Sequence, residues 1–439
     1  MLAATLLLGL GALGGVGNRE PAQERGTTLS QPGDSLAVLV QRVHPALVVL
    51  RAKAQAATGR IAAAADVQPA VFSLEVEDVP GGGRFWAANQ LRSAIEGEVF
   101  GGGRRSARRD QATSEANTEQ ARLRAAEHAA AAATKARSVT WLAGMATARR
   151  LLVEDSLLAA AEEALTARFG AGAATYVEVL RVRAERLRVQ TDRAAAIADA
   201  GEARVLLLGW LSGDSSAMRS GASVLDSLAA VPIADFDAAN LPATPAVDTT
   251  GASEAVAGIA ASLSREGAAR SRLGIALVRP TALGAVGVQQ FQSAIGRRVF
   301  GATLGLKVSL PFTAQSHNRA SIRAARLDAD ALAVQGTALL GSWARELSVL
   351  RVRYEAERAR AQVYQSSLLA DLRGEREAAL AAYRNGALGL FELLDFERTL
   401  VRAEIDQIHS VRNALITWHR LAAGIPTILA EELGLGGNP

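Results

Sequence analysis

The sequence has no cysteine and few aromatic residues, and both absences exclude classes of protein. Without cysteine, its 439 residues hold no disulfide, no thiolate metal site, no cysteine nucleophile and no lipid-modified N-terminal cysteine. Aromatic residues make up 4% of the chain, whereas alanine and arginine are abundant. Because alanine and arginine are strong helix formers, the composition favours long helices over compact mixed domains.

Signals for catalysis and for nucleic-acid binding are also absent. The net charge is only +4, and almost all of the basic residues are arginine, so a high isoelectric point needs no concentrated basic face. The glycine runs at 81–83 and 101–103 lack the Lys-Ser/Thr pair of a phosphate loop. The histidines have no metal-ligand spacing: His44, His128, His317, His409 and His419. We therefore expect no enzymatic activity, no cofactor, no metal site and no nucleic-acid partner.

The first seventeen residues form an uncharged, glycine-rich apolar run, which ends abruptly at Asn18 and Arg19. This pattern predicts a signal peptide over residues 1–17, followed by an N-terminal segment over 18–34. The alternative is a single membrane anchor, for which the run is short against the roughly 20 residues that a bilayer needs.

Internal repetition is the most informative feature of the remaining chain. Pro69–Glu77 and Pro280–Val288 are similar at an offset of 211, and Phe100 and Phe312 are 212 apart. Further on, Phe169-x-x-Gly172 with Glu178 matches Tyr383-x-x-Gly386 with Glu392 at an offset of 214. Landmarks that keep their order at nearly one spacing indicate a duplication.

Each repeat is predicted to be a helix, two strands, a long helix, a tight turn and a second long helix. The first repeat spans 35–211, with strands at about 70–79 and 88–100 and a helical hairpin over 106–210. The second spans 250–426, with strands at about 279–292 and 300–310 and a hairpin over 319–423. A proline-containing linker or irregular belt (212–249) joins the repeats, and a tail (427–439) follows them.

The helices are longer than a compact domain allows. Ser106 to Arg168 contains no proline over 63 residues, about 95 Å of continuous helix, and Arg319 to Ala382 is similar. Apolar and small residues then recur alternately four and three apart, which predicts a coiled-coil seam: Leu180, Ala184, Leu187, Thr191, Ala194, Ala198, Gly201, Val205 and Leu208. A comparable rhythm runs through Leu339, Trp343, Leu347, Leu350 and Tyr354.

The predicted strands alternate apolar and polar residues, which suits either a half-buried sheet or a wall between lipid and a watery lumen. Two strands in each repeat give four, too few to close a barrel within one chain. Membrane strands must close their hydrogen-bond ladder, and three chains would supply twelve.

Taken together, the doubled pattern of Phe169-x-x-Gly172 and Tyr383-Arg-Asn-Gly386 with the acidic residues after them resembles the TolC family of outer-membrane efflux proteins. The resemblance covers residues 35–426. Within that family, PAVFSLEVEDVP at 69–80 and EVFGGGRRSARRDQA at 98–112 are most similar to the heavy-metal, CzcC-type branch.

The resemblance implies a mainly α fold with a small β part. Three chains would form a twelve-stranded β-barrel in outer-membrane lipid, continued by an α-helical coiled-coil tunnel through the periplasm. The implied partners are two further copies of the chain, a periplasmic adaptor protein and a proton-driven inner-membrane pump of the RND type.

Two sets of residues acquire roles through the resemblance. Those at the tips of the hairpins would contact the adaptor: Arg168, Phe169, Gly170, Gly172, Arg384, Asn385, Gly386 and Ala387. Those near the tips would form the constriction of the pore: Glu178, Glu392, Asp395 and Tyr383. The ordinary interpretations are that the glycines only make turns and that the acidic residues are solvated or paired with Arg181, Arg183 or Arg398.

Two other functions stay open at this point, a coiled-coil scaffold of the cell envelope without channel activity and an outer-membrane channel for type I secretion. The sequence does not identify the cargo, which can be a metal ion, a drug or a polypeptide.

Overall fold

The computed structural model describes residues 31–66, 69–77, 90–101, 103–228, 236–245, 251–292, 297–308 and 315–424. The predicted signal peptide, the glycines at 81–83, Phe312 and the predicted tail over 427–439 lie outside the described residues.

Both repeats have the predicted order of elements, and the mainly helical fold with a small sheet is confirmed. The first repeat contains α1 (Gln31–Val43), α2 (Pro45–Ala65), β1 (Val71–Glu77), β2 (Gln90–Phe100), α3 (Arg104–Gly170) and α4 (Tyr176–Gly209). The second contains α6 (Gly251–Val278), β3 (Ala282–Gln292), β4 (Arg298–Val308), α7 (Gln315–Val363), α8 (Leu369–Arg384) and α9 (Leu390–Ala423).

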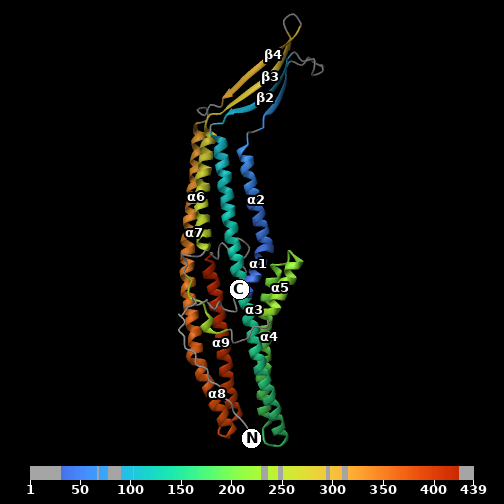
Figure 1. Ribbon diagram of the computed structural model, residues 1–439, viewed down its shortest axis with the longest axis vertical. Coiled ribbons are helices and arrows are strands. Elements are labelled where there is room, and N and C mark those ends of the chain that lie inside the picture. Colours follow the sequence, from blue (N-terminus) through green and yellow to red (C-terminus); the bar gives the residue numbers. More distant parts are fainter. Residues whose placement is uncertain are drawn as a thin grey trace, which may run out of the picture.

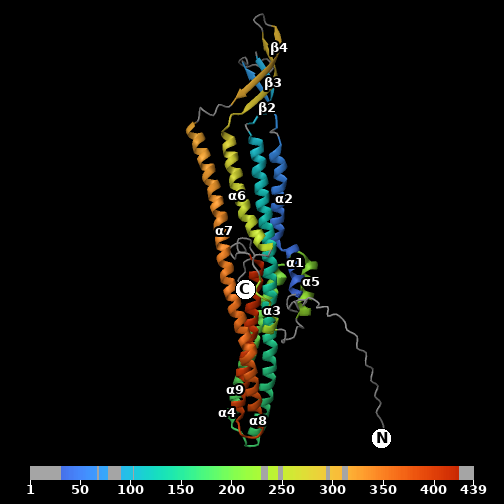
Figure 2. The same ribbon diagram turned by 60° about the vertical axis from the view of Figure 1, so that its left-hand side comes forward.

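The elements form one elongated body with the sheet at one end and the two hairpin tips at the other (Figure 1). The sheet is antiparallel, in the order β1-β2-β3-β4. Next to the sheet, contacts between neighbours give the helix order α2-α3-α6-α7, and Figure 2 shows these helices side by side. Toward the tips the order is α4-α3-α9-α8. The body is therefore a wall one element thick for much of its length.

The long helix of the first repeat is unbroken, as predicted, but its counterpart is not. α3 runs for 67 residues, whereas a π-helical turn at Tyr364–Leu368 separates α7 from α8. The predicted helix over 319–382 is therefore present, since the chain stays helical from Gln315 to Arg384, but one π-helical turn interrupts its α-helical hydrogen bonds. The turn lies where a connecting segment meets it, since Gln365 Oε1 accepts a hydrogen bond from the Ala239 amide at 3.2 Å. Such turns insert one extra residue into the helical ladder.

The region between the repeats is more ordered than a linker. Residues Ser215–Leu228 form an additional helix, α5, which packs beside α1 on the outside of the wall. The described segment 236–245 crosses the second repeat, where Phe236, Ala238 and Leu241 are buried. Trp418 Nε1 donates to Ala243 O at 3.0 Å, and Tyr354 donates to Pro242 O. The segment is fastened to α7 and α9 at mid-height.

The core lies at this mid-height, where both repeats meet. Leu347 and Tyr354 of the predicted α7 seam are buried in it, and Trp343 and Leu350 pack against it. Alanine fills much of the remainder, and it lets helices approach closely.

Candidate functional site

The two hairpin tips share one backbone geometry. Gly172 follows α3 and Gly386 follows α8, and both have a φ of +72°, a conformation that favours glycine. At the first tip the Ala173 amide donates to the carbonyl of Arg168 at 2.8 Å, and the second tip repeats this bond at 2.9 Å. The duplication therefore extends to the hydrogen bonds of the turns.

The residues predicted to contact a partner at the tips are exposed in the chain: Arg168, Phe169, Gly170, Gly172, Arg384, Asn385, Gly386 and Ala387. The rings of Phe169 and Tyr176 lie 5.6 Å apart across the first tip. A Cβ atom added at Gly172 would meet no atom within 4 Å. The tips are open to a partner, and the contact itself stays a prediction.

Two of the predicted constriction residues cap helices. Glu178 Oε2 accepts from the Thr175 amide at 2.7 Å, and Glu392 Oε2 accepts from the Gly389 amide at 3.0 Å. Each carboxylate lies in the first turn of its helix, where the helix dipole favours negative charge. Hydrogen bonds from Thr175 lower the pKa of Glu178 below its ordinary value. These glutamates therefore stabilise helix starts in a single chain, whatever they do in an assembly.

The other two predicted constriction residues are placed differently. Asp395 lies one turn after Glu392; its side chain is 75% exposed, with Oδ1 3.8 Å from Arg398 Nη1. Tyr383 is half-buried in the last turn of α8. Glu392 and Asp395 line a common pocket, whose described lining residues include neither Glu178 nor Tyr383. One chain therefore brings two of the four predicted residues together.

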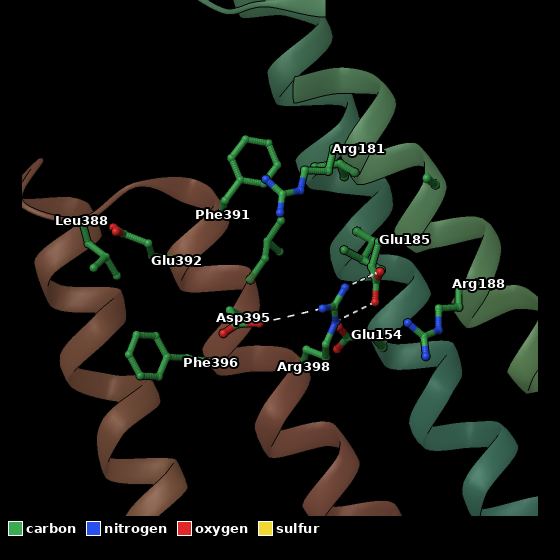
Figure 3. Close-up of a pocket in the computed structure, with 14 residues that line it drawn as sticks. Glu154, Arg181, Glu185, Arg188, Leu388, Phe391, Glu392, Asp395, Phe396 and Arg398 are labelled. Atoms are coloured by element: carbon green, nitrogen blue, oxygen red, sulfur yellow. Dashed lines mark hydrogen bonds and ion pairs between the residues drawn. The ribbon is translucent and has the colours of Figure 1, made fainter. Parts of the chain in front are cut away.

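This pocket, of about 910 Å³, lies between the lower parts of α4 and α9 (Figure 3). α3 contributes Glu154 and Leu158 to it. The rest of the lining combines aromatic and basic side chains with aliphatic ones. The Arg181 guanidinium lies 5.2 Å from the centre of the Phe391 ring. This distance suits a cation–π contact, which links α4 to α9.

A salt bridge crosses the same pocket. Arg398 Nε donates to Glu185 Oε1 at 2.8 Å, and Arg398 Nη2 pairs with the second carboxylate oxygen. Two parallel contacts of this kind fix both distance and orientation. The Glu185–Arg398 pair therefore ties the two hairpins together near their tips, and Figure 3 shows it between the two ribbons.

Glu154, at the base of the pocket, is a buried carboxyl. It is 5% exposed, its Oε2 has no hydrogen-bond partner, and Arg150 Nη1 is 4.0 Å away. Burial raises the pKa of Glu154 above its ordinary value, and Arg150 opposes that shift. The wall thus contains a carboxyl whose ionised form is disfavoured.

The sequence interpretation considered Arg398 as an ion-pair partner but did not include Glu185, Glu154 or Arg188. Glu185 and Arg398 are 213 residues apart, nearly the offset between the repeats. At the offset of 214 that relates the two tips, Glu185 aligns with Thr399, so aligning the repeats places the two charges one residue out of register and does not identify the pair. No signal marks Glu154 either, since its burial depends on how α3 packs.

The sheet has one apolar and one polar face. Across all strands the register aligns Phe72, Ile95, Val286 and Leu304, which are 64%, 57%, 64% and 86% exposed. On the opposite face, Arg92 is 3.6 Å from Glu75, and Lys307 is 2.8 Å from Glu96. An apolar row of this length is costly in water, so the row requires an apolar neighbour.

The edges of the wall are also apolar. The predicted seam on α4 is exposed from Leu180 to Val205, with Leu187 at 58% and Val205 at 69%. α4 packs on α3 through the opposite row: Val179, Val182, Val189, Ala196, Ala200, Ala203 and Leu207. The chain itself therefore does not use the predicted seam.

A second seam follows the opposite edge of the wall. Exposed residues on α7 are spaced alternately three and four apart: Ala324, Leu327, Ala331, Val334 and Ala338. Both long edges of the wall thus have the spacing of coiled-coil contacts and no partner in the described chain.

Metal sites and membrane-spanning helices were sought over the described ranges. There, no three histidine, aspartate or glutamate side chains are placed to hold a metal ion. No single described helix is long and apolar enough to cross a membrane. Gly33–Val43 and Pro45–Ala65, two helices with a bend of 50° between them, are together long and apolar enough by length and composition.

No family model and no curated protein matches the sequence. Solved structures do match the fold. A membrane protein from Pseudomonas aeruginosa superposes with a TM-score of 0.71 at 15% identity, over 91% of this chain and 95% of that one. The outer membrane protein VceC from Vibrio cholerae gives 0.68 at 16%, over 89% and 96%. The CmeC outer membrane channel of Campylobacter jejuni gives 0.68 at 12%, over 96% and 94%.

These likenesses extend over nearly the whole of each chain. The protein therefore has the fold of TolC-type outer-membrane channels, with the sheet and both helical hairpins included.

Proposed function

We propose that this protein is the outer-membrane channel of a three-part efflux system and works as a homotrimer. The observation that carries the proposal is a wall one element thick, apolar along both long edges, with a two-faced sheet at one end. A scaffold made of helices alone would not need a sheet with one apolar and one polar face. The fold adds support, because VceC and CmeC share it.

Closure of the wall explains the two apolar edges. One edge consists of β1, α2 and, toward the tips, α4. The other edge consists of β4, α7 and, toward the tips, α8. When the first edge of one chain meets the second edge of the next, both seams are covered and the strands continue from chain to chain. Three chains would give twelve strands without a free ladder in lipid.

The two-faced sheet suits a membrane barrel. The row containing Ile95 and Leu304 would contact lipid, and the ion pairs on the opposite face would line a watery lumen. The protein would then lie in the bacterial outer membrane, with the long helices in the periplasm. The exposed tips would meet a periplasmic adaptor, which connects them to an inner-membrane RND pump.

Heavy-metal cations are the finer part of the proposal. Segments 69–80 and 98–112 are similar to the CzcC-type branch, and Glu392 and Asp395 lie together near the tip. Threefold repetition would turn these carboxylates into rings, which favour cations. Glu178 and Tyr383 belong to the same proposed constriction.

The test is electrical. Purified protein added to a planar lipid bilayer should give discrete conductance steps, and fractionation of the cell envelope should place it in the outer membrane. Absence of conductance from a protein that is folded and present in the outer-membrane fraction would reject the channel and leave the scaffold.

A further inference from the structure

The charge of the helical wall is unevenly distributed close to the sheet. Five arginines lie at the end of α6, directly after it, or on the first turns of α7, and we call them the basic collar: Arg272, Arg279, Arg319, Arg323 and Arg326. All five are exposed. Arg272 pairs with Asp110 at 3.0 Å, and the other four have no ion-pair partner among the described residues.

The collar lies on the convex side of the wall. A pocket of about 790 Å³ is lined by all of α2, α3, α6 and α7, so it marks the concave side. Arg272 lies two positions after Arg270 of that pocket, and Arg323 lies nine before Leu332. At 3.6 residues per turn, a separation of two or nine residues rotates a side chain by about half a turn relative to its reference residue. Arg272 and Arg323 therefore project away from the pocket, on the convex side.

The concave side at the same height has mixed charge. Arg122 pairs with Glu119 at 3.0 Å, and Arg270 pairs with Glu266 at 2.5 Å. Lys53 and Arg60 of α2 also line the pocket on the concave side, without an ion pair among the described residues. Both sides of the wall therefore carry unpaired positive charge near the sheet, and the outer side carries the four unpaired arginines of the collar.

The position of the collar is unfavourable without an external anion. α7 begins at Gln315 with no acidic residue in its first turn, and Arg319 follows just after that turn. The N-terminus of a helix carries a partial positive charge, so an arginine there is electrostatically unfavourable unless an anion binds next to it. This argument concerns the arginines on α7 only, since Arg279 follows the C-terminus of α6, where the helix dipole favours a cation.

The height of the collar identifies the partner. Arg279 lies three residues before the first residue of β3, and Arg319 lies eleven after the last residue of β4. The collar thus begins where the apolar face of the sheet ends, on the outside of a closed wall. At that level a membrane presents the phosphates of its lipid headgroups.

We propose that the basic collar binds the phosphate groups of anionic lipids in the inner leaflet of the outer membrane. The inference rests on the proposed function, because the sheet must span that membrane. Guanidinium groups bind phosphate through paired hydrogen bonds, and three chains would present fifteen of them around the barrel. The collar would then fix how deeply the barrel lies in the bilayer.

The test uses the full chain in detergent with an equal mixture of phosphatidylcholine and phosphatidylglycerol, and counts retained lipids by native mass spectrometry. The wild type should retain phosphatidylglycerol over phosphatidylcholine by about tenfold, and substitution of Arg279, Arg319 and Arg323 by Gln should abolish that preference. Substitution of the same three by Lys should keep most of it, and high salt should weaken it.

The control replaces exposed arginines far from the sheet, Arg219, Arg353 and Arg402, by Gln, and it should retain the wild-type preference. Equal preference in the collar variant and the wild type would overturn the proposal. The proposal would also be overturned if the collar variant kept the lipid preference of the wild type but no longer bound isolated cell-wall polymer. That result would make the polymer, and not lipid, the ligand of the collar. Conductance of the same wild-type preparation separates these results from failure of the channel proposal itself.

Discussion

Arg398 on α9 and Glu185 on α4 are 213 residues apart in the chain, yet Arg398 Nε lies 2.8 Å from Glu185 Oε1. The pair spans α3 and joins the hairpin of one repeat to that of the other. The Arg181–Phe391 contact and the Arg150–Glu404 ion pair also join the first hairpin to α9. Since the Glu185–Arg398 pair is bidentate and lies near the tips, a change in it should alter how freely the tips separate.

The first prediction concerns this pair. Arg398→Gln leaves Glu185 without its ionic partner and should lower the free energy of unfolding by about 1 kcal/mol, since both side chains are partly exposed. Amide exchange at the start of α9 should become faster. The swap Glu185→Arg with Arg398→Glu should restore both properties. Asp395→Asn is the control, because Asp395 is 3.8 Å from Arg398 and should matter little.

The second prediction separates the two rows of α4. Leu187→Glu places a charge on the exposed seam and should reduce the native mass from trimer toward monomer with little change in the stability of one chain. Val189→Glu, two residues further on, places the charge against α3, where Val189 is 7% exposed, and should impair folding itself. Equal trimer content in Leu187→Glu and wild type would remove the seam from the interface.

The third prediction separates the two faces of the sheet. Val286→Lys introduces a charge into the apolar row and should reduce membrane insertion, at a cost of roughly 2–4 kcal/mol near the middle of a bilayer. Gln289→Lys, on the polar face opposite Arg92 in the register, should insert normally. Insertion of both variants at the same yield would contradict the assignment of the lipid-facing side.

The fourth prediction distinguishes helix capping from pore selectivity. Glu392→Gln keeps an oxygen for the Gly389 amide but removes the charge. Asp395→Asn removes the charge of a side chain that is 75% exposed. The double variant should fold as wild type and show a lower cation-over-anion permeability ratio in bilayer recordings. Exposed Glu163→Gln should leave the ratio unchanged. Unaltered selectivity in the double variant would leave these residues with their capping and surface roles only.

The fifth prediction concerns acid sensitivity. Burial lowers the pKa of His419 to about 4, with Lys135 adding to the shift and Asp34 opposing it. An unfolded chain binds this proton near pH 6.5, so the folded state loses stability as pH falls from 6.5 to 4, by about 1.4 kcal/mol per unit. His419→Gln should therefore lose less thermal stability between pH 7 and pH 5 than wild type. Exposed His317→Gln should behave as wild type.

Much of the fold could be predicted because both repeats contain the same residues at their turns and helix ends. Gly172 and Gly386 mark turns that need a left-handed residue, and the absence of proline over 106–168 allows one helix. Alternation in the strands gave the two faces of the sheet. These signals are local, so the sequence displays them directly.

The remainder depends on contacts between distant segments. The π-helical turn at Tyr364–Leu368 lies where residues 236–245 cross the second repeat, and no local pattern reveals that crossing. The seam on α4 was recognised by its spacing, but spacing alone does not say whether the partner helix belongs to the same chain. Glu154 is buried only because α4 and α9 flank α3.

The most direct test of the central claim is the native mass of the protein in mild detergent, taken from a fractionated cell envelope. Closure of the wall by its two apolar edges predicts particles of about three times the mass of one mature chain, recovered from the outer membrane. A monomer or dimer in that extract would show that the edges do not close a ring of three, and would contradict the channel.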